Sequence, residues 1–244
     1  MREEKITFNI PKPEFQTRES VNILRGNIQM SGSEIRVVAV TSSGEHEGKS
    51  SVSFQLASSL AALEKKVLFL DCDIRNSKLK KRYGIAEKTL GLSEYLCGYL
   101  SAEELPYSTS IPYMDVVFAG TPAPNPSELL SGARFAEFME RARKRYDYIV
   151  VDTPPGNLVV DASLVARHCD VTVLVVEYGQ TPYTEAVRVK EKLESYGIKI
   201  LGVVLNKVPK EGGRYGKYGK YGKYGKYGYG YGYGYGEKHG KERS

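Results

Sequence analysis

The chain has 244 residues, of which 41% are hydrophobic, enough for one large domain with a buried core plus a tail. It has no run of 18 apolar residues and no apolar stretch after its charged start, so we expect neither a membrane span nor a secretory signal. The last 35 residues hold nine of the 35 basic and three of the 29 acidic residues, so they carry the whole net charge of +6. The remaining body is neutral, which argues against a nucleic-acid-binding domain.

The three cysteines are Cys72, Cys97 and Cys169, and they are too widely spaced for a metal knuckle. Their odd number argues against a disulfide scaffold and suits a reducing, cytoplasmic compartment.

Strand and helix patterns alternate along the body. The first 15 residues contain two prolines and little periodicity, so we expect an extended arm over 1–15, and apolar residues at helical spacing predict a helix over 16–31 that Gly32 ends. Predicted strands cover 35–40, 66–70, 114–118, 147–151, 171–176 and 199–205, and predicted helices cover 49–63, 127–145, 159–168 and 182–196. The strands are rich in β-branched residues and almost continuously apolar. This alternation predicts a mainly parallel α/β sheet with helices on both faces.

A phosphate-binding loop follows the first predicted strand. The segment "SGEHEGKS" (43–50) fits G-x-x-x-x-G-K-[ST], except that Ser43 replaces the first glycine. In such a loop, backbone N–H groups surround phosphate oxygens, the lysine reaches the β- and γ-phosphates, and the hydroxyl holds Mg²⁺. A capped helix start with a chance Gly-Lys-Ser is the alternative. The predicted nucleotide-binding residues of the loop are Ser43, Gly44, Glu45, His46, Glu47, Gly48, Lys49, Ser50 and Ser51.

Carboxylates follow two other predicted strands. Asp71 and Asp73 should point to one side of their strand, and Cys72 to the other as a core residue. Asp152 follows the strand at 147–151. Because ligands of parallel sheets bind at the carboxyl ends of strands, we expect these groups beside the loop, where they can hold metal and accept a proton. The three motifs together predict a P-loop NTPase-like protein that hydrolyses a nucleotide or transfers a phosphoryl group.

The C-terminal segment has a composition that cannot build a core. Residues 214–236 contain nine of the 19 tyrosines, nine glycines and five basic residues, and nothing else. We therefore predict a folded domain over 16–209 and a disordered Tyr/Gly/Lys-rich tail over 210–244. The tail is either a basic, aromatic arm for nucleic acid or a polysaccharide surface, or its tyrosine hydroxyls are a substrate.

Residues 19–208 resemble the bacterial tyrosine kinases (BY-kinases) of capsule and exopolysaccharide synthesis. The resemblance rests on "DCDIR" (71–75), "GTPAPNPSELL" (120–130), "DTPPG" (152–156) and the tyrosine cluster. It implies a cytoplasmic kinase that uses ATP and Mg²⁺ to phosphorylate its own C-terminal tyrosines and so regulates polysaccharide synthesis or export. The implied partners are further copies of the chain in a ring, a membrane adaptor that activates the kinase at the inner face of the cell membrane, and a cognate tyrosine phosphatase.

The resemblance also assigns residue roles. Asp71 matches a candidate general base for the tyrosine hydroxyl. Apart from the resemblance, Asn206 follows the last predicted strand, where it either reads the adenine edge or ends the strand in a plain turn. The implied catalytic residues are Lys49, Asp71 and Asp73, the implied metal ligands are Ser50, Asp71 and Asp152, and Arg75 supports the motif. The expected phosphoacceptors are Tyr215, Tyr218, Tyr221, Tyr224, Tyr227, Tyr229, Tyr231, Tyr233 and Tyr235.

The chain departs from the family pattern in two places. The family has proline and glycine where this chain has Glu45 and His46, so we expect weaker nucleotide binding if the backbone there needs a positive φ. His46 is either a tolerated substitution or an acid–base group. The family's first helix carries E-x-x-R-x-x-R, which here reads Glu19, Asn22 and Arg25, so ring assembly is expected to be weaker or to use other contacts.

The alternative class is the P-loop ATPases of chromosome partitioning and division-site placement, which switch between monomer and dimer. They share the predicted sheet and loop but carry an extra lysine near the start of the loop. No lysine occurs between Ile35 and Gly48 here, which argues against that class.

Overall fold

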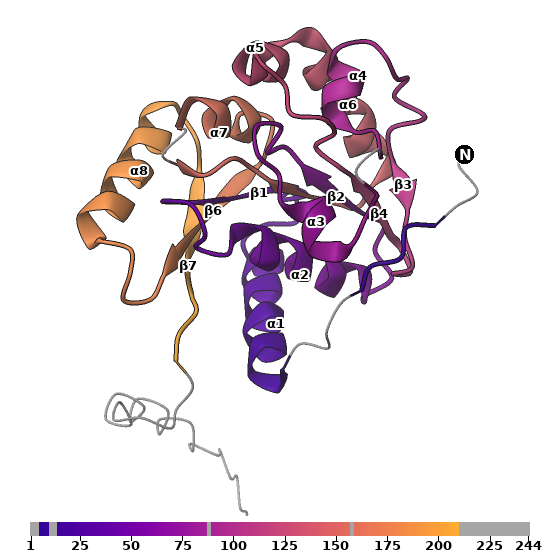
Figure 1. The fold of residues 1–244 in the computed structure, drawn as a ribbon. Coiled ribbons are helices and arrows are strands. Elements are labelled where there is room, and N and C mark those ends of the chain that lie inside the picture. The colour runs from indigo at the N-terminus through magenta and orange to yellow at the C-terminus, as the bar shows by residue number, and fades with distance from the viewer. Residues whose placement is uncertain (1–4, 10–13, 87–88, 157–158, 210–244) are drawn as a thin grey trace, which may run out of the picture. The chain divides into compact units, whose positions relative to one another are not determined.

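The computed structural model describes residues 5–9, 14–86, 89–156 and 159–209 (Figure 1). A seven-stranded sheet with the order β3-β4-β2-β5-β1-β6-β7 forms its centre. The strands are β1 (Val37–Ser42), β2 (Val67–Asp71), β3 (Tyr107–Ser108), β4 (Met114–Val117), β5 (Tyr148–Asp152), β6 (Val171–Glu177) and β7 (Ile200–Asn206). Only β3, at one edge, runs antiparallel to its neighbour. The mainly parallel P-loop fold predicted from the sequence is confirmed.

Helices cover both faces of the sheet (Figure 1). One face carries α1 (Phe15–Met30), α2 (Lys49–Ala61) and α3 (Leu79–Tyr83), and the other carries α4 (Leu92–Leu96), α5 (Pro126–Ser131), α6 (Ala133–Arg145), α7 (Val159–Ala166) and α8 (Tyr183–Ser195). The alternation of strand side chains fills both layers: Val38 and Val40 lie in the core under α2, whereas Val37 lies in the core under α6. Burial on both faces explains why the strands read as nearly continuous apolar runs.

Two predictions about elements need correction. The helix predicted over 127–145 is two helices, because Gly132 adopts an extended conformation (φ −74°, ψ 157°) and separates α5 from α6. The sequence analysis also missed α3, α4 and β3, which have five, five and two residues. Segments that short do not display a helical or alternating period.

The arm before α1 is extended where it is described. The N–H of Ile6 donates to the carbonyl of Ser108 at 2.8 Å, and the N–H of Ser110 donates to the carbonyl of Ile6 at 2.8 Å. The Phe8 ring is buried, with its centroid 4.9 Å from that of Phe54. Residues 5–9 are therefore anchored to the body by backbone hydrogen bonds and by one aromatic side chain.

The tail predicted over 210–244, with its nine expected phosphoacceptors, lies outside the described residues. The division of the chain into arm, kinase domain and tail remains a prediction. Among the described helices, none is long and apolar enough to cross a membrane.

Candidate nucleotide and catalytic site

The predicted site residues gather at one edge of the sheet. The strands β2, β5 and β1 are adjacent and parallel, so their carboxyl ends open at the same edge. Asp71 at the end of β2 and Asp152 at the end of β5 are register partners. The phosphate loop follows β1 at this edge and leads into α2, which begins at Lys49. Parallel pairing therefore brings together three motifs that are far apart in sequence.

The loop has the shape of a phosphate cradle. Gly48 adopts φ 95° directly before α2, a conformation that favours glycine, and a Cβ there would lie 2.1 Å from Nδ2 of Asn206 and displace that side chain. The N-terminus of α2 then presents backbone N–H groups at the loop, an arrangement that suits phosphate oxygens. Ser43 is fully buried at the start of the loop, and its hydroxyl has no hydrogen-bond partner among the described residues.

Lys49 lies between two carboxylates. Its Nζ is 3.4 Å from Oδ1 of Asp152 and 3.5 Å from Oδ2 of Asp73, and its side chain is 12% exposed. Burial lowers the pKa of Lys49, but attraction to Asp152, Asp73 and Asp71 outweighs burial and leaves the pKa above its usual value. The ammonium group is therefore charged at any physiological pH.

Asp71 is buried beside other acidic groups. Burial raises its pKa to about 7, and the neighbouring charge of Asp152 acts in the same direction, whereas a hydrogen bond from the Ser77 hydroxyl opposes the rise. The second carboxylate oxygen accepts the N–H of Asp73 at 3.1 Å. Cys72, between the two, lies in the core on the opposite side, as the strand alternation predicts.

The donor set near the loop fits Mg²⁺. Burial raises the pKa of Asp152, and hydrogen bonding from Ser50 opposes the rise. Within the described ranges, no three histidine, cysteine or carboxylate side chains converge as a metal-holding group. Since Mg²⁺ prefers oxygen ligands and is bound by one or two carboxylates plus substrate phosphates, the Ser50 hydroxyl with the Asp71 and Asp152 carboxylates at a phosphate cradle suits it.

Arg75 is held by a buried carboxylate on α7. Its Nε donates to Oδ2 of Asp161, which is only 1% exposed, and its Nη2 lies 3.3 Å from the hydroxyl of Ser127 on α5. The Ser127 hydroxyl donates to the other oxygen of Asp161 at 2.5 Å. Hydrogen bonds of Arg75 therefore hold the segment after β2 against α5 and α7.

The three residues in the middle of the phosphate loop differ in exposure to solvent. His46 adopts φ 64°, the left-handed region, and its side chain is 82% exposed. The Glu45 side chain is 57% exposed and so is largely directed to solvent. Glu47 is buried, and its backbone carbonyl accepts a hydrogen bond from Nδ2 of Asn206 at 2.8 Å. Asn206 therefore contacts the loop backbone from the end of β7.

Sequence reasoning missed several residues that hold the site together. Ser77 contacts Asp71, Asp161 contacts Arg75, and Thr181 contacts Glu47. Ser127 lies within the family-like motif at 120–130, and Asp161 lies shortly after the one at 152–156, but no local sequence pattern indicates that their side chains meet. Thr181 has no sequence signal, because its contact spans 134 positions of the chain.

A family model of P-loop NTPases and several tyrosine kinases each match most of the chain. A family model described as "ParA: NUBPL iron-transfer P-loop NTPase" matches residues 34–210. Tyrosine-protein kinase CpsD of Streptococcus agalactiae serotype Ia is 41% identical over 200 residues, which span 82% of this chain and 86% of that relative. The kinase domain of the Escherichia coli tyrosine kinase Etk is 32% identical with a TM-score of 0.79, over 95% of this chain and 89% of that one.

The alternative class is more distant. The septum site-determining protein MinD of Pyrococcus horikoshii is 23% identical with a TM-score of 0.60, over 70% of each chain. At that identity, the likeness reflects the shared fold alone.

Proposed function

Because the chain belongs to the bacterial tyrosine-protein kinases, a P-loop class of kinase, we propose that it transfers the γ-phosphoryl group of ATP to tyrosines of its own C-terminal segment. The observation that carries the proposal is the convergence of Lys49, Asp73 and Asp152 beside Asp71 at the mouth of the phosphate loop. Phosphoryl transfer depends mainly on positioning and on neutralising phosphate charge, and this group supplies both a cation and a proton acceptor.

Each residue of the site has a separate role in the proposed phosphoryl transfer. Lys49 and the backbone N–H groups of the loop bind the β- and γ-phosphates, while Ser50, Asp152 and Asp71 provide the oxygen ligands for Mg²⁺. When bound, Mg²⁺ neutralises charge on the phosphate oxygens. Asp71 accepts the proton of the tyrosine hydroxyl as the phenolic oxygen attacks the γ-phosphorus and ADP leaves.

Asp73 and Arg75 act as supports. Asp73 contacts Lys49, and its other oxygen accepts the N–H of Asn76 at 3.2 Å, so it links the lysine to the segment after β2. Arg75 fixes the same segment through Asp161. Asn206 is the last residue of β7 and positions the loop backbone through its hydrogen bond to the carbonyl of Glu47. Its proposed second role is to contact the adenine ring.

The proposed substrate is the tyrosine cluster from Tyr215 to Tyr235. Its alternating glycines predict a segment that can present each hydroxyl in turn to one active site. We further propose a cytoplasmic location at the inner face of the membrane through an adaptor protein, transfer between copies in a ring, and reversal by a cognate tyrosine phosphatase. The regulated process is capsule or exopolysaccharide synthesis, and direct nucleic-acid binding is not expected from the neutral body.

Self-association through α1 is expected to depart from the family pattern. At the position of the missing arginine, Oδ1 of Asn22 accepts a hydrogen bond from the Ser59 hydroxyl at 3.2 Å. Nη1 of Arg25 donates to the carbonyl of Ser59 at 2.8 Å. Both side chains therefore bond to α2 of the same chain, whereas Glu19 is exposed and its Oε1 accepts a hydrogen bond from Nδ2 of Asn22 at 3.3 Å.

The test is autophosphorylation with ATP and Mg²⁺, mapped by mass spectrometry with and without an adaptor's cytoplasmic segment. We expect phosphotyrosine in the C-terminal cluster of the wild-type chain and none in Lys49→Met or Asp71→Asn variants that keep the wild-type circular dichroism spectrum. Full activity in the Asp71→Asn variant would remove Asp71 as the base. An unmodified tail under both conditions would contradict the proposal and favour the binding-arm interpretation.

A further inference from the structure

The phosphate loop contains a buried carboxylate, that of Glu47, whose two oxygens both accept hydrogen bonds from groups of the protein. Glu47 is only 6% exposed, although its neighbour Glu45 in the same loop is largely exposed. Oε2 of Glu47 accepts the backbone N–H of Gly44 at 2.9 Å, and Oε1 accepts the hydroxyl proton of Thr181. The first bond closes a four-residue turn, and the second ties that turn to the segment between β6 and α8.

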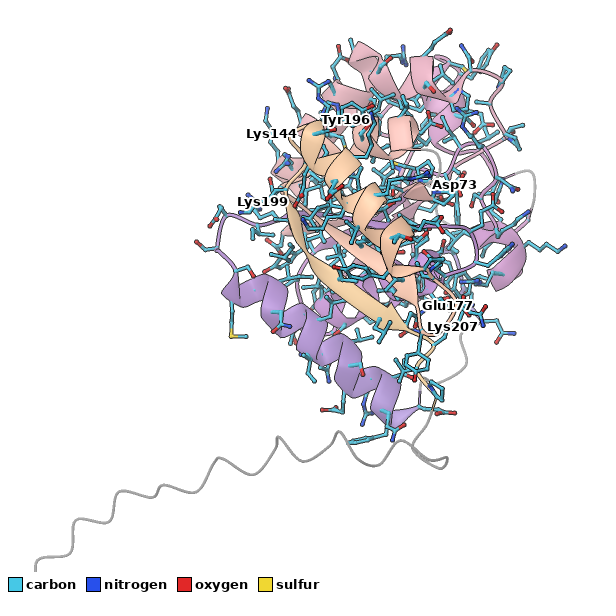
Figure 2. All side chains as sticks on the ribbon, turned by 90° about the vertical axis from the view of Figure 1, so that its left-hand side faces the viewer. Asp73, Lys144, Glu177, Tyr196, Lys199 and Lys207 are labelled. Carbon is cyan, nitrogen blue, oxygen red and sulfur yellow. The ribbon has the colours of Figure 1, made fainter. Side chains whose placement is uncertain are left out.

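Thr181 is oriented for this contact by a second hydrogen bond. Its Oγ1 accepts the N–H of Glu177 at 2.8 Å, and its own N–H donates to the carbonyl of Glu177 at 3.1 Å. A hydroxyl has one proton, and because Oγ1 already accepts from Glu177, that proton is directed to Glu47. The carboxylate of Glu177 is in turn paired with Nζ of Lys207 at 2.7 Å (Figure 2), which fixes the ends of β6 and β7 together.

We infer that Thr181 is a positioning residue for phosphoryl transfer, which acts through Glu47 on the conformation of residues 44–48. Between the two ends of the Gly44–Glu47 bond lies His46 in the left-handed region, a conformation that a non-glycine residue holds only when its surroundings impose it. Glu47 and Thr181 provide that constraint.

The same contact also acts through charge. A carboxylate within a phosphate cradle repels phosphate oxygens if it can turn toward them. The donors Gly44 and Thr181 occupy both oxygens of Glu47 and keep its side chain buried within the protein. Without the Thr181 hydroxyl, the Glu47 carboxylate loses one of its two charge-assisted hydrogen bonds, and the loop has more conformations in which it does not bind a triphosphate.

The experiment is a calorimetric titration of the full chain with a non-hydrolysable ATP analogue and Mg²⁺. Thr181→Val removes the hydroxyl and keeps the branched shape, and we expect the dissociation constant to rise on the order of tenfold at unchanged stoichiometry. Thr181→Ser keeps the hydroxyl and should retain affinity close to that of the wild type. Thr184→Val, at an exposed threonine one residue into the first turn of α8, is the matched control and should bind as the wild type does.

Enzyme kinetics and a double-mutant cycle with Glu47 distinguish a positioning role of Thr181 from a general effect on stability. In tyrosine phosphorylation we expect KM for ATP to rise in Thr181→Val, with kcat changing much less. A variant that was merely unstable would bind with lower stoichiometry at the original dissociation constant, which would overturn the inference. In a Glu47→Ala background, Thr181→Val should add little further loss of affinity, because its partner is already absent.

Other outcomes also decide the inference. It is overturned if Thr181→Val binds with wild-type affinity, if Thr181→Ser fails to retain affinity, or if the losses of the double variant are additive. If Thr181→Val does not fold, Thr181→Ala takes its place, and wild-type affinity in that variant overturns the inference. The inference rests on the proposed use of ATP: a wild-type chain that does not bind the analogue contradicts both, whereas normal wild-type binding with an unaffected Thr181→Val contradicts only the role of Thr181.

Discussion

His46 is a non-glycine residue of the phosphate loop that adopts a positive φ. The family that the sequence resembles has glycine at this position, and the structure shows φ 64° with a mostly exposed His46 side chain. We predict that His46→Gly tightens binding of a non-hydrolysable ATP analogue several-fold, since relief of this backbone strain is worth on the order of 1 kcal/mol. Tyr113→Gly, at another exposed residue with φ 64°, is the control that relieves similar strain away from the loop and should leave affinity unchanged. Equal or weaker binding by His46→Gly would mean that the imidazole contacts the nucleotide.

Asp71 gives the protein a pH dependence that can be measured without turnover. Its pKa of about 7 in the folded chain lies well above the usual value of about 3.9 for an unfolded aspartate. The stabilisation from its protonated form is therefore complete below about pH 4 and is lost as the pH rises toward and through about 7. We predict that, without nucleotide, the free energy of unfolding in urea falls less between pH 5 and pH 8 for Asp71→Asn than for the wild type. Parallel pH profiles would contradict the raised pKa.

Much of the site could be predicted because each motif follows a strand. Asp71, Asp152 and the phosphate loop are local patterns, and the rule that parallel strands open at one edge brings them together. The contacts of Ser77, Asp161 and Thr181 could not be predicted, because they depend on which loops meet in space. Asn206 was identified from its place after a strand. Its hydrogen bond to the carbonyl of Glu47 could not be predicted, because it depends on how the end of β7, two strands away from β1 in the sheet, meets the loop.

At the scale of elements, the longer strands and helices could be predicted from their apolar patterns, whereas the short elements α3, α4 and β3 could not. The strands on both sides of the centre were predicted within a few residues, but β1 continues to Ser42, because its pairing with β6 extends into the polar residues Thr41 and Ser42. Gly132 divides one predicted helix into α5 and α6, and a single glycine within a helical pattern does not reveal whether it will break the helix.

The first helix offers a test of how firmly it is packed on α2. Ile28 is fully buried within the core that α1 shares with α2, whereas Ile23 on the same helix is 63% exposed. We predict that Ile28→Ala lowers the free energy of unfolding by about 2–5 kcal/mol, because it removes buried methyl groups and leaves a cavity. Ile23→Ala is the matched control and should change it by about 0.5 kcal/mol or less. Similar losses in urea unfolding for both variants would contradict the tight packing of α1.

At the scale of the whole molecule, the charge of the chain is divided between a neutral body and a basic C-terminal segment. Each phosphotyrosine adds roughly −1.5 to −2 charges, so about three or four phosphates cancel the +6 of residues 210–244. Beyond that number, segments of neighbouring chains should repel one another and a closed assembly should loosen. Phosphorylation would then act as a graded change of charge that depends on how many tyrosines are modified, not on which one.

We predict that the phosphoryl group is transferred between chains, and a mixture of two variants tests this prediction. A flexible segment of about 20 residues has a root-mean-square span of about 25 Å, which is enough to reach an adjacent copy. The mixture combines a Lys49→Met chain with its tail intact and an active chain truncated after Val208, where the first compact unit ends. We predict phosphotyrosine on the tail of the inactive chain, at a rate that rises with the concentration of the truncated one, and none when both chains carry Lys49→Met. Because the truncated chain retains the loop, the carboxylates and Asn206, failure of transfer in the mixture alongside normal labelling of the intact wild-type chain would mean that each active site modifies only its own tail.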